Sequence, residues 1–343
     1  EQDQLNLIDY STWEDASLPH SFSIPYFLDN NVYQGYGWYY KEIEIPEEWM
    51  NKNISLEFEG AFIETELFVN SIEVGKHVGG YTGFNFDISK YIKPGKNKIA
   101  IRINNLWKPD VAPRAGDHQF SGGIYRDVYL NISDKLHIDW QGVFIQTPSV
   151  SKSEATCLAL IEVKNNYQDN KEFTLVTQVL SPQGELLSTT KTATTLDAHQ
   201  QIKINQVLPN INRPQLWSPD SPNLYTSKSS IYIGDEEIDR YDVSFGIRKF
   251  EWTADKGFFL NDKPFYIKGV NVHQDQAGWG DAVTNAAIYR DVQLIKDAGF
   301  NAIRGSHYPH DPAFSKACDE IGLLLFQENV LWGMGGSSGD RGW

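Results

Sequence analysis

Up to about residue 133 the dominant pattern is an alternation of apolar and polar side chains, and this period of two restricts the fold more than any other feature. An apolar residue occupies every second position of such a run, as in Ile54, Leu56, Phe58 and again in Ile99, Ile101, Ile103. Successive side chains of a strand point to opposite faces, so these runs predict strands that are buried on one side only.

Turn-forming pairs separate the runs within residues 1–133. They are Glu59-Gly60, Asn70-Ser71, Gly79-Gly80 and Pro94-Gly95, and such residues favour tight turns because of their backbone preferences. No convincing helical period interrupts the series. We therefore predict that residues 1–133 form an antiparallel β-sandwich of the jelly-roll type.

A second series of strands is predicted within residues 134–247. Its apolar runs are Leu158 to Val163, Phe173 to Val179, Ile202 to Leu208 and Tyr225 to Ile233. Roughly seven short strands in about 110 residues are typical of an immunoglobulin-like sandwich.

The period changes near residue 248, where residues 248–343 begin to alternate strands with helices. An apolar strand is predicted at Phe265 to Val270, followed by a helix that repeats Ile288, Val292 and Ile295 at i, i+4, i+7 and ends at Gly299.

A second unit of the same kind follows directly. Its strand is Asn301 to Arg304, and its helix begins with Asp311 as N-cap and Pro312 at the first position and ends before Gly322. A third strand, Leu323 to Phe326, comes next. This order predicts a parallel sheet with crossover helices, and the pattern alone leaves a doubly wound sheet open as well, although no glycine-rich phosphate loop follows the first strand.

The bulk composition excludes several classes of protein. The net charge is -15 and no basic run appears, whereas nucleic-acid binding needs clustered Lys and Arg, so no nucleic-acid partner is expected. No run of about 18 apolar residues occurs, so no membrane span is expected. The only cysteines, Cys157 and Cys318, fall in different predicted domains, which argues against a disulfide framework.

Polar side chains follow each of the three predicted parallel strands. They are His273 and Asp275 after the first, Arg304 and His307 after the second, and Glu328 and Asn329 after the third. The carboxyl ends of parallel strands lie on one face, so we expect these groups to gather there. A purely structural role is the alternative, in which each histidine is held by its neighbours and Arg304 pairs with Glu328.

Five stretches resemble glycoside hydrolase family 2, the β-galactosidase and β-glucuronidase type of enzyme, in the family's own order. They are GYGWYYKEIEIP (Gly35 to Pro46), SGGIYRDVYL (Ser121 to Leu130), LWSPDSPNLY (Leu216 to Tyr225), GFFLNDKPFYIKGVNVHQD (Gly257 to Asp275) and GFNAIRGSHYP (Gly299 to Pro309). The resemblance implies a jelly-roll sugar-binding domain, an immunoglobulin-like domain and the first three strands of an eight-stranded (β/α)8 TIM barrel.

The resemblance also implies a retaining mechanism, which uses two carboxylates about 5 to 5.5 Å apart. In this family they are glutamates after the fourth and seventh barrel strands, and neither position exists in this sequence, so no catalytic residue is expected here. The pair Glu328-Asn329 has the reverse order of the family's acid/base motif and follows the third strand. Glu328 is therefore interpreted either as a group on the floor of the site or as a charge-pairing group.

Three further residues are implied as sugar contacts or platforms. Asp117 stands six residues before Gly123, where the family carries an acidic residue that reaches the sugar pocket, and Trp279 and Trp332 can stack on a sugar or simply pack on the barrel rim. Some galactosidases bind magnesium with a Glu and a His just beyond the third strand. Here that stretch reads LWGMGG (Leu331 to Gly336), so no metal and no cofactor are expected.

The expected function is that of an exo-glycosidase acting on terminal β-linked sugars, and β-galactosides are the favoured substrates. The alternatives are β-glucuronidase or β-mannosidase specificity, or a carbohydrate-binding protein without catalysis. The expected partner is an oligosaccharide or glycoside, and a homo-oligomer is compatible with the sequence. A secreted or periplasmic location is expected, with the cytoplasm as the alternative, and the chain by itself is expected to be inactive.

Overall fold

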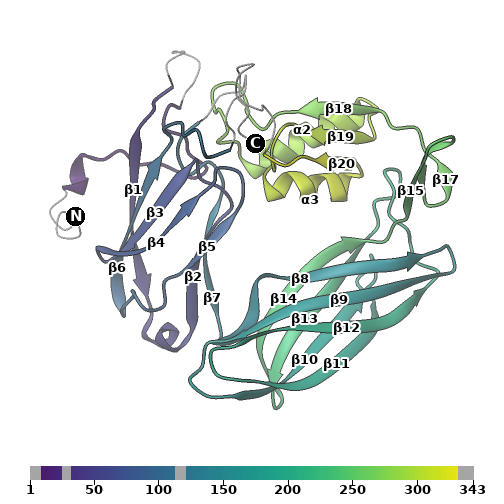
Figure 1. Ribbon diagram of the computed structural model, residues 1–343, viewed down its shortest axis with the longest axis horizontal. Helices are drawn as coiled ribbons and strands as arrows, with labels where there is room; N and C mark the ends of the chain where they lie inside the picture. Colours follow the sequence, from purple (N-terminus) through teal and green to yellow (C-terminus); the bar gives the residue numbers. More distant parts are fainter. Residues whose placement is uncertain (1–8, 25–31, 113–120, 331–343) are drawn as a thin grey trace.

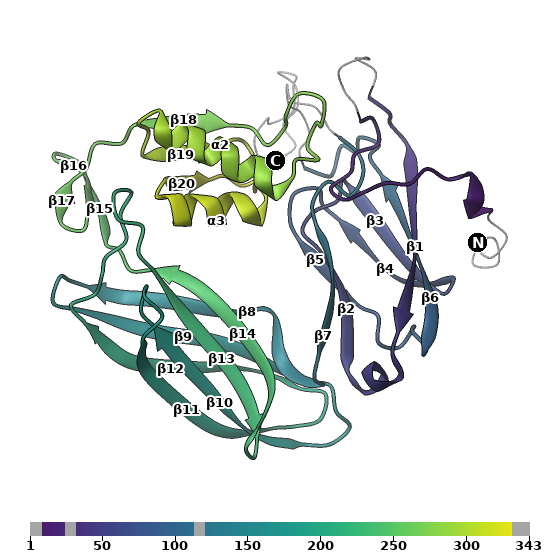
Figure 2. The same ribbon diagram turned by 180° about the vertical axis from the view of Figure 1, so that it is seen from behind.

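The structure, a computed structural model, describes residues 9–24, 32–112 and 121–330. Two β-sandwiches lie side by side, and a smaller α/β unit lies across one end of both, as Figures 1 and 2 show from opposite sides. The α/β unit therefore contacts both sandwiches, and its position relative to them determines which residues surround its strand ends.

The first sandwich, called the jelly-roll sandwich below, consists of two antiparallel sheets of order β1-β6-β3-β4 and β5-β2-β7. Short 3-10 helices are found at Tyr10–Thr12 and Glu47–Asn51. The strands are β1 (Tyr36–Ile45), β2 (Asn53–Phe58), β3 (Glu64–Val69), β4 (Ile72–Val78), β5 (Phe84–Asp87), β6 (Gly95–Asn104) and β7 (Val128–Ser133). The alternating residues predicted to be buried do form the core, since Ile54, Phe58 and Ile103 are fully buried between the sheets.

The second sandwich pairs a sheet of order β11-β10-β13-β14 with one of order β12-β9-β8. Its strands are β8 (Leu136–Val150), β9 (Glu154–Asn165), β10 (Lys171–Leu180), β11 (Leu186–Leu196), β12 (Gln201–Asn212), β13 (Leu224–Ile233) and β14 (Glu236–Gly246). Each of the four apolar runs predicted from the sequence lies within one of these strands. Their inward side chains, such as Ile161, Leu175 and Ile231, are excluded from solvent.

The α/β unit is a parallel sheet of order β18-β19-β20 whose strands are β18 (Gly269–Val272), β19 (Ala302–Gly305) and β20 (Leu324–Gln327). Helix α2 (Asn285–Asp297) and helix α3 (Pro312–Ile321) connect them and cover one face. Asp311 is the N-cap of α3, with its side chain accepting from the Ala313 amide at 2.8 Å, as predicted. Gly322 ends this helix in the left-handed conformation.

The first parallel strand begins later than predicted. Residues Phe265 and Ile267 were expected within it, but they pack with Phe258 and Leu260 of a small hairpin sheet, β15 (Phe250–Thr253), β16 (Gly257–Leu260) and β17 (Lys263–Pro264). An apolar run has no period by which a strand can be distinguished from a buried connection. The packing against a neighbouring unit therefore decided the boundary.

Trp217 fastens the second sandwich to the α/β unit. Its indole is buried among Phe258, Ala302 and Leu324, and its Nε1 donates to the Asp319 carbonyl at 2.8 Å. The contact continues at Gly322, where a Cβ atom would lie 2.4 Å from the Pro219 carbonyl oxygen. The end of α3 is therefore in close contact with the backbone of the second sandwich.

The sequence argued against a membrane span and against a disulfide framework, and the structure bears on both. Within the described ranges, no helix is long and apolar enough to cross a membrane. Cys157 and Cys318 are both buried free thiols, in the second sandwich and in α3 respectively. Each therefore serves as a small apolar side chain of its own core.

Alanine substitutions at Gly322 and Gly299 separate the effect of backbone strain from the effect of the close contact between Gly322 and Pro219. Both glycines have left-handed φ angles, +89° and +87°, but nothing lies within 4 Å of a Cβ at Gly299. We expect Gly299→Ala to cost about 1 kcal/mol through strain alone, whereas Gly322→Ala also clashes with Pro219 and lowers the melting temperature clearly further in scanning calorimetry. Equal shifts for the two variants would contradict the close contact.

Candidate functional site

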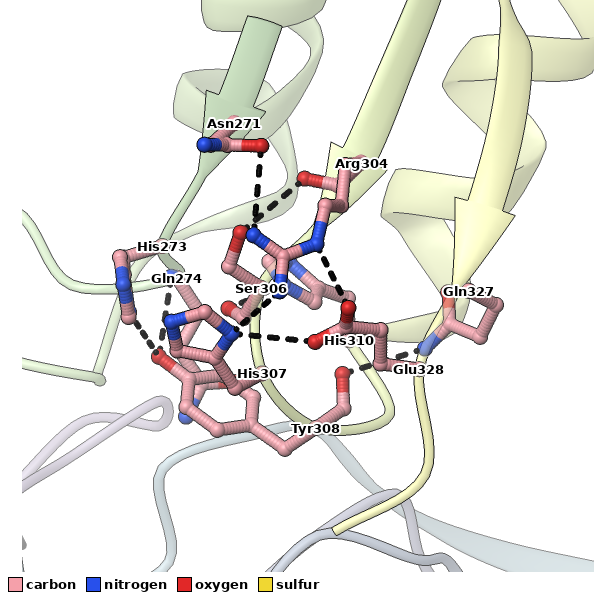
Figure 3. Close-up of polar contacts among 10 residues, drawn as sticks. All are labelled: Asn271, His273, Gln274, Arg304, Ser306, His307, Tyr308, His310, Gln327 and Glu328. Carbon is pink, nitrogen blue, oxygen red and sulfur yellow. Dashed lines mark hydrogen bonds and ion pairs between the residues drawn. The ribbon is translucent and has the colours of Figure 1, made fainter. Parts of the chain in front are cut away.

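The carboxyl ends of β18, β19 and β20 point toward the jelly-roll sandwich, and four of the polar residues predicted from the sequence, His273, Arg304, His307 and Glu328, gather there (Figure 3). The parallel register places Asn271 beside Arg304 and Arg304 beside Phe326. These side chains share the sheet face opposite α2 and α3, because the alternate residues Val272 and Ile303 pack against the helices. Glu328 follows on the same side as Phe326.

Arg304, His307 and Glu328 form one charged cluster. The Arg304 Nε donates to Glu328 Oε1 at 2.6 Å, and His307 Nδ1 lies 3.0 Å from both Glu328 Oε2 and Arg304 Nη2. The pairing of Arg304 with Glu328, considered from sequence as a structural alternative, is thus present. One nitrogen cannot donate to Glu328 and accept from Arg304 at once, so His307 Nδ1 forms a hydrogen bond with only one of the two side chains at a time.

The electrostatics of this cluster keep Glu328 ionised. Burial acts to raise its pKa, but the hydrogen bonds and charges of Arg304 and His307 outweigh it and hold the pKa of the carboxyl below its ordinary value. Glu328 is therefore an anion at neutral pH, which makes it an acceptor for hydroxyl groups and a poor proton donor. The charge pairing of Glu328 with Arg304 is present in the structure, whereas its place on the floor of a sugar site stays a prediction.

His273 lies beside the cluster and is oriented by a buried tyrosine. Its Nδ1 is 3.1 Å from the Tyr308 hydroxyl, and its ring is edge-on to His307 with a centroid distance of 5.0 Å. Tyr308 stacks in turn on Tyr81 of the jelly-roll sandwich at 4.3 Å. The first and second strand ends are therefore held together by aromatic packing from a different domain.

The remaining residues predicted for the site have different outcomes. Asp275 is exposed and makes no hydrogen bond or ion pair with another described residue, although its charge acts on Asp281. Trp279 lies in the same loop and is 52% exposed. Asp117 and Trp332 lie outside the described residues, and so does the LWGMGG stretch for which the absence of a metal was predicted. The described ranges contain no group of three His, Cys, Asp or Glu residues suited to a metal ion.

Arg126 was not singled out from the sequence, although it lies in the stretch Ser121 to Leu130. Its side chain is almost fully buried and donates to carbonyls of Glu59 and Tyr81 at 3.2 and 3.1 Å in the jelly-roll sandwich. It also donates to Gln274 Oε1 at 3.0 Å and to the Pro309 carbonyl at 2.7 Å in the α/β unit. One guanidinium thus fixes the loops after β18 and β19 to the neighbouring domain.

Asp281 is a second residue that sequence reasoning missed. It is buried at the same interface, and its amide donates to Ser121 Oγ at 3.3 Å. Burial, with the nearby Asp275 carboxylate, raises the pKa of Asp281 to about 7. A loop aspartate gives no sign of burial in the sequence, because only the contact between domains removes it from water.

Comparison with known proteins identifies the class to which this architecture belongs. Three sequence models match in order: "Glycosyl hydrolases family 2, sugar binding domain" over residues 6–133, "Glycosyl hydrolases family 2" over 136–248, and "Glycosyl hydrolases family 2, TIM barrel domain" over 253–340. The sheet β18-β19-β20 thus represents the first strands of a TIM barrel that carries two β-sandwiches before it. The chain belongs to glycosyl hydrolase family 2.

Individual relatives agree with this assignment. A β-galactosidase of Thermoanaerobacter pseudethanolicus is 32% identical over 98% of this chain and 44% of its own length. A β-glucuronidase of Bacteroides fragilis is 34% identical over 95% of this chain and 48% of its own length. The crystal structure of a Bacteroides uniformis β-glucuronidase superposes with a TM-score of 0.91 at 34% identity, over 95% of this chain and 40% of that one. The chain therefore spans less than half of these relatives.

Replacing Arg126 with methionine is expected to loosen the strand-end loops. The substitution leaves buried carbonyls of two domains without a donor, at about 1–3 kcal/mol each. Hydrogen exchange measured by mass spectrometry is then expected to be roughly tenfold faster or more in residues 274–283 and 306–311. Arg290→Met is the control, because the Arg290 side chain is 64% exposed on α2. Unchanged exchange in both loops for Arg126→Met would show that the guanidinium does not restrain them.

Asp281 is expected to make the fold less stable as pH rises. Its folded pKa of about 7 exceeds the ordinary value of 3.8, so between these values the native state binds more protons than the unfolded state and stability falls. Asp281→Asn, which carries no charge, is expected to be more stable than the parent at pH 8, on the order of a few kcal/mol, and equal to it near pH 4. Thermal unfolding of both proteins across this range measures the difference, and Asp235→Asn, in an exposed turn, is expected to change nothing.

Proposed function

We propose that the whole protein containing this chain is a retaining exo-glycosidase that hydrolyses terminal β-linked sugars. The observation that supports it most is the cluster of His273, Arg304, His307 and Glu328 at the carboxyl ends of three parallel strands, the face on which TIM-barrel enzymes hold their active sites. Membership of glycosyl hydrolase family 2 and the names of the relatives point the same way.

In this proposal the cluster binds the sugar and does not perform the chemistry. Arg304 and the two imidazoles offer N–H donors, and Glu328 is an ionised acceptor, so together they match the donor and acceptor hydroxyls of a sugar ring. Asp117, Asp275 and Trp332 remain proposed contacts of the same site. The acid/base and nucleophile glutamates that retention requires follow barrel strands that this sequence does not contain.

The sugar that we favour is a β-galactoside, and the ion pair between Arg304 and Glu328 supports this choice. Its charge is already offset by Glu328 at 2.6 Å, so the guanidinium is not a spare cation for the carboxylate of an acidic sugar. A β-glucuronide is the second candidate, because relatives from two Bacteroides species carry the name β-glucuronidase. A carbohydrate-binding protein without catalysis is the alternative from another class.

An activity panel on the whole protein tests the proposal. We expect hydrolysis of nitrophenyl β-galactoside, with β-glucuronide and β-mannoside as comparisons, and no turnover by the 343-residue chain. Arg304→Ala in the whole protein is expected to lower kcat/KM about 100-fold or more through lost sugar positioning, whereas Arg290→Ala leaves it unchanged. Absence of hydrolysis of all three substrates sinks the enzyme proposal, and turnover by the 343-residue chain sinks the assignment of its residues to binding alone.

A further inference from the structure

A polar groove of about 370 Å³ lies between the jelly-roll sandwich and the second sandwich, away from the strand-end cluster. Its first wall is the outer face of the sheet β5-β2-β7, the jelly-roll sheet nearer the second sandwich in Figure 1. Its second wall is formed by residues of β8 and β14. The volume falls within the roughly 300–1,000 Å³ typical of small-molecule sites.

The first wall is a regular array of short polar side chains. Strand register places Ser55 between Asp87 and Asn131, and places Glu57 beside Asn85 in the next row. All five line the groove. A sheet face exposed only to water has no need of this composition, since longer charged side chains are the common choice there. The array instead offers amide, hydroxyl and carboxylate groups at the spacing of neighbouring strands, about 5 Å.

The second wall adds an aromatic ring and further polar groups. Trp140 and His137 of β8 line it together with Asp239 of β14, whose Oδ2 accepts from the Ile138 amide at 2.8 Å. Tryptophan combines a flat apolar face with one N–H donor. The two walls therefore present an apolar surface opposite a set of hydrogen-bonding groups.

Three buried polar atoms of the groove lack partners. Asn85 Oδ1, His137 Nδ1 and Trp140 Nε1 have no hydrogen bond within the part of the chain that the structure describes. His137 as a whole is only 5% exposed. Buried polar groups are nearly always hydrogen-bonded, and leaving one unsatisfied costs about 1–3 kcal/mol. All three atoms belong to residues that line the same groove, so a polar ligand in the groove is a candidate for the partner that the described residues do not supply.

The charges of the groove indicate the nature of that guest. Four carboxylates, those of Glu57, Asp87, Asp139 and Asp239, outnumber the cations Lys164 and Arg240. An anionic ligand is therefore disfavoured. A metal ion is disfavoured too, because no three His, Cys, Asp or Glu residues among those described are arranged around a common point. Neutral hydroxyl groups satisfy this wall best, since they donate to carboxylates and accept from the indole N–H.

We propose that this groove is a second carbohydrate site, which binds a neutral oligosaccharide through Asn85, Trp140 and the array on β2, β5 and β7. The proposal goes beyond the proposed function, because it concerns binding between the two sandwiches and requires no hydrolysis. Such a site holds a glycan to the protein while another part of the same or a neighbouring glycan reaches the strand-end cluster, which raises the effective concentration of the substrate.

Nuclear magnetic resonance of the 343-residue chain tests the site directly. The indole N–H signal of Trp140, assigned from its loss in Trp140→Phe, is followed while cellotetraose or β-1,4-galactotetraose is added up to about 10 mM, which covers millimolar affinity. We expect a saturable shift with at least one of these neutral sugars and none with trigalacturonate. This titration measures binding only, so it tests the groove even if the whole protein hydrolyses none of the substrates in the activity panel.

Two variants separate the groove from the rest of the surface. Asn85→Ala is expected to weaken the binding about fivefold or more, by removing an amide that lines the groove, whereas Asn205→Ala, exposed on β12, which contributes no residue to the groove, binds as the parent does. Calorimetry confirms that each variant is folded. No shift with either neutral sugar, a shift produced by calcium chloride alone, or equal binding by Asn85→Ala and the parent would each overturn the proposal.

Discussion

The arrangement of the candidate site depends on one buried guanidinium. Arg126 extends from the jelly-roll sandwich and donates to the loops after β18 and β19. Short parallel strands cannot by themselves fix the loops that follow them, because loop backbones lack ladder hydrogen bonds. The planar, permanently charged fork of arginine supplies several donors in a fixed geometry. The stacking of Tyr81 on Tyr308 adds apolar contact at the same interface. The jelly-roll sandwich is therefore part of the site's framework.

The ionisable side chains around the strand ends differ in protonation state because their neighbours differ. Glu328 is paired with Arg304 and His307 and stays ionised, whereas Asp281, buried in the loop after β18 and close to Asp275, holds its proton near neutral pH. Two carboxyl groups of the same unit therefore differ in charge because their surroundings differ. His310 is a third case, since burial lowers its pKa to about 4 and leaves it a neutral ring whose Nε2 lies 3.0 Å from the Ser306 carbonyl oxygen.

The sequence predicted the elements well where a local pattern carried them. Alternation at Ile54 and Phe58 identified β2, and Asp311 with Pro312 marked the start of α3. The placement of Arg304, His307 and Glu328 at neighbouring strand ends also followed, because parallel strands bring their carboxyl ends to one edge. The predicted start of the first parallel strand was wrong, because Phe265 packs with the hairpin sheet and β18 begins only at Gly269. Local patterns describe a residue's own element and carry no information about distant partners.

The sequence by itself determined the order of two sandwiches and a βα series, the family, and the residues that reach the strand ends. Only the tertiary structure decided the groups that act across domain boundaries: Arg126, Asp281 and the groove between Asn85 and Trp140. The physical reason is that burial and hydrogen-bond partners at these positions arise from segments more than a hundred residues apart for Arg126 and Asp281. Their chemistry changes only when the domains meet and remove them from water.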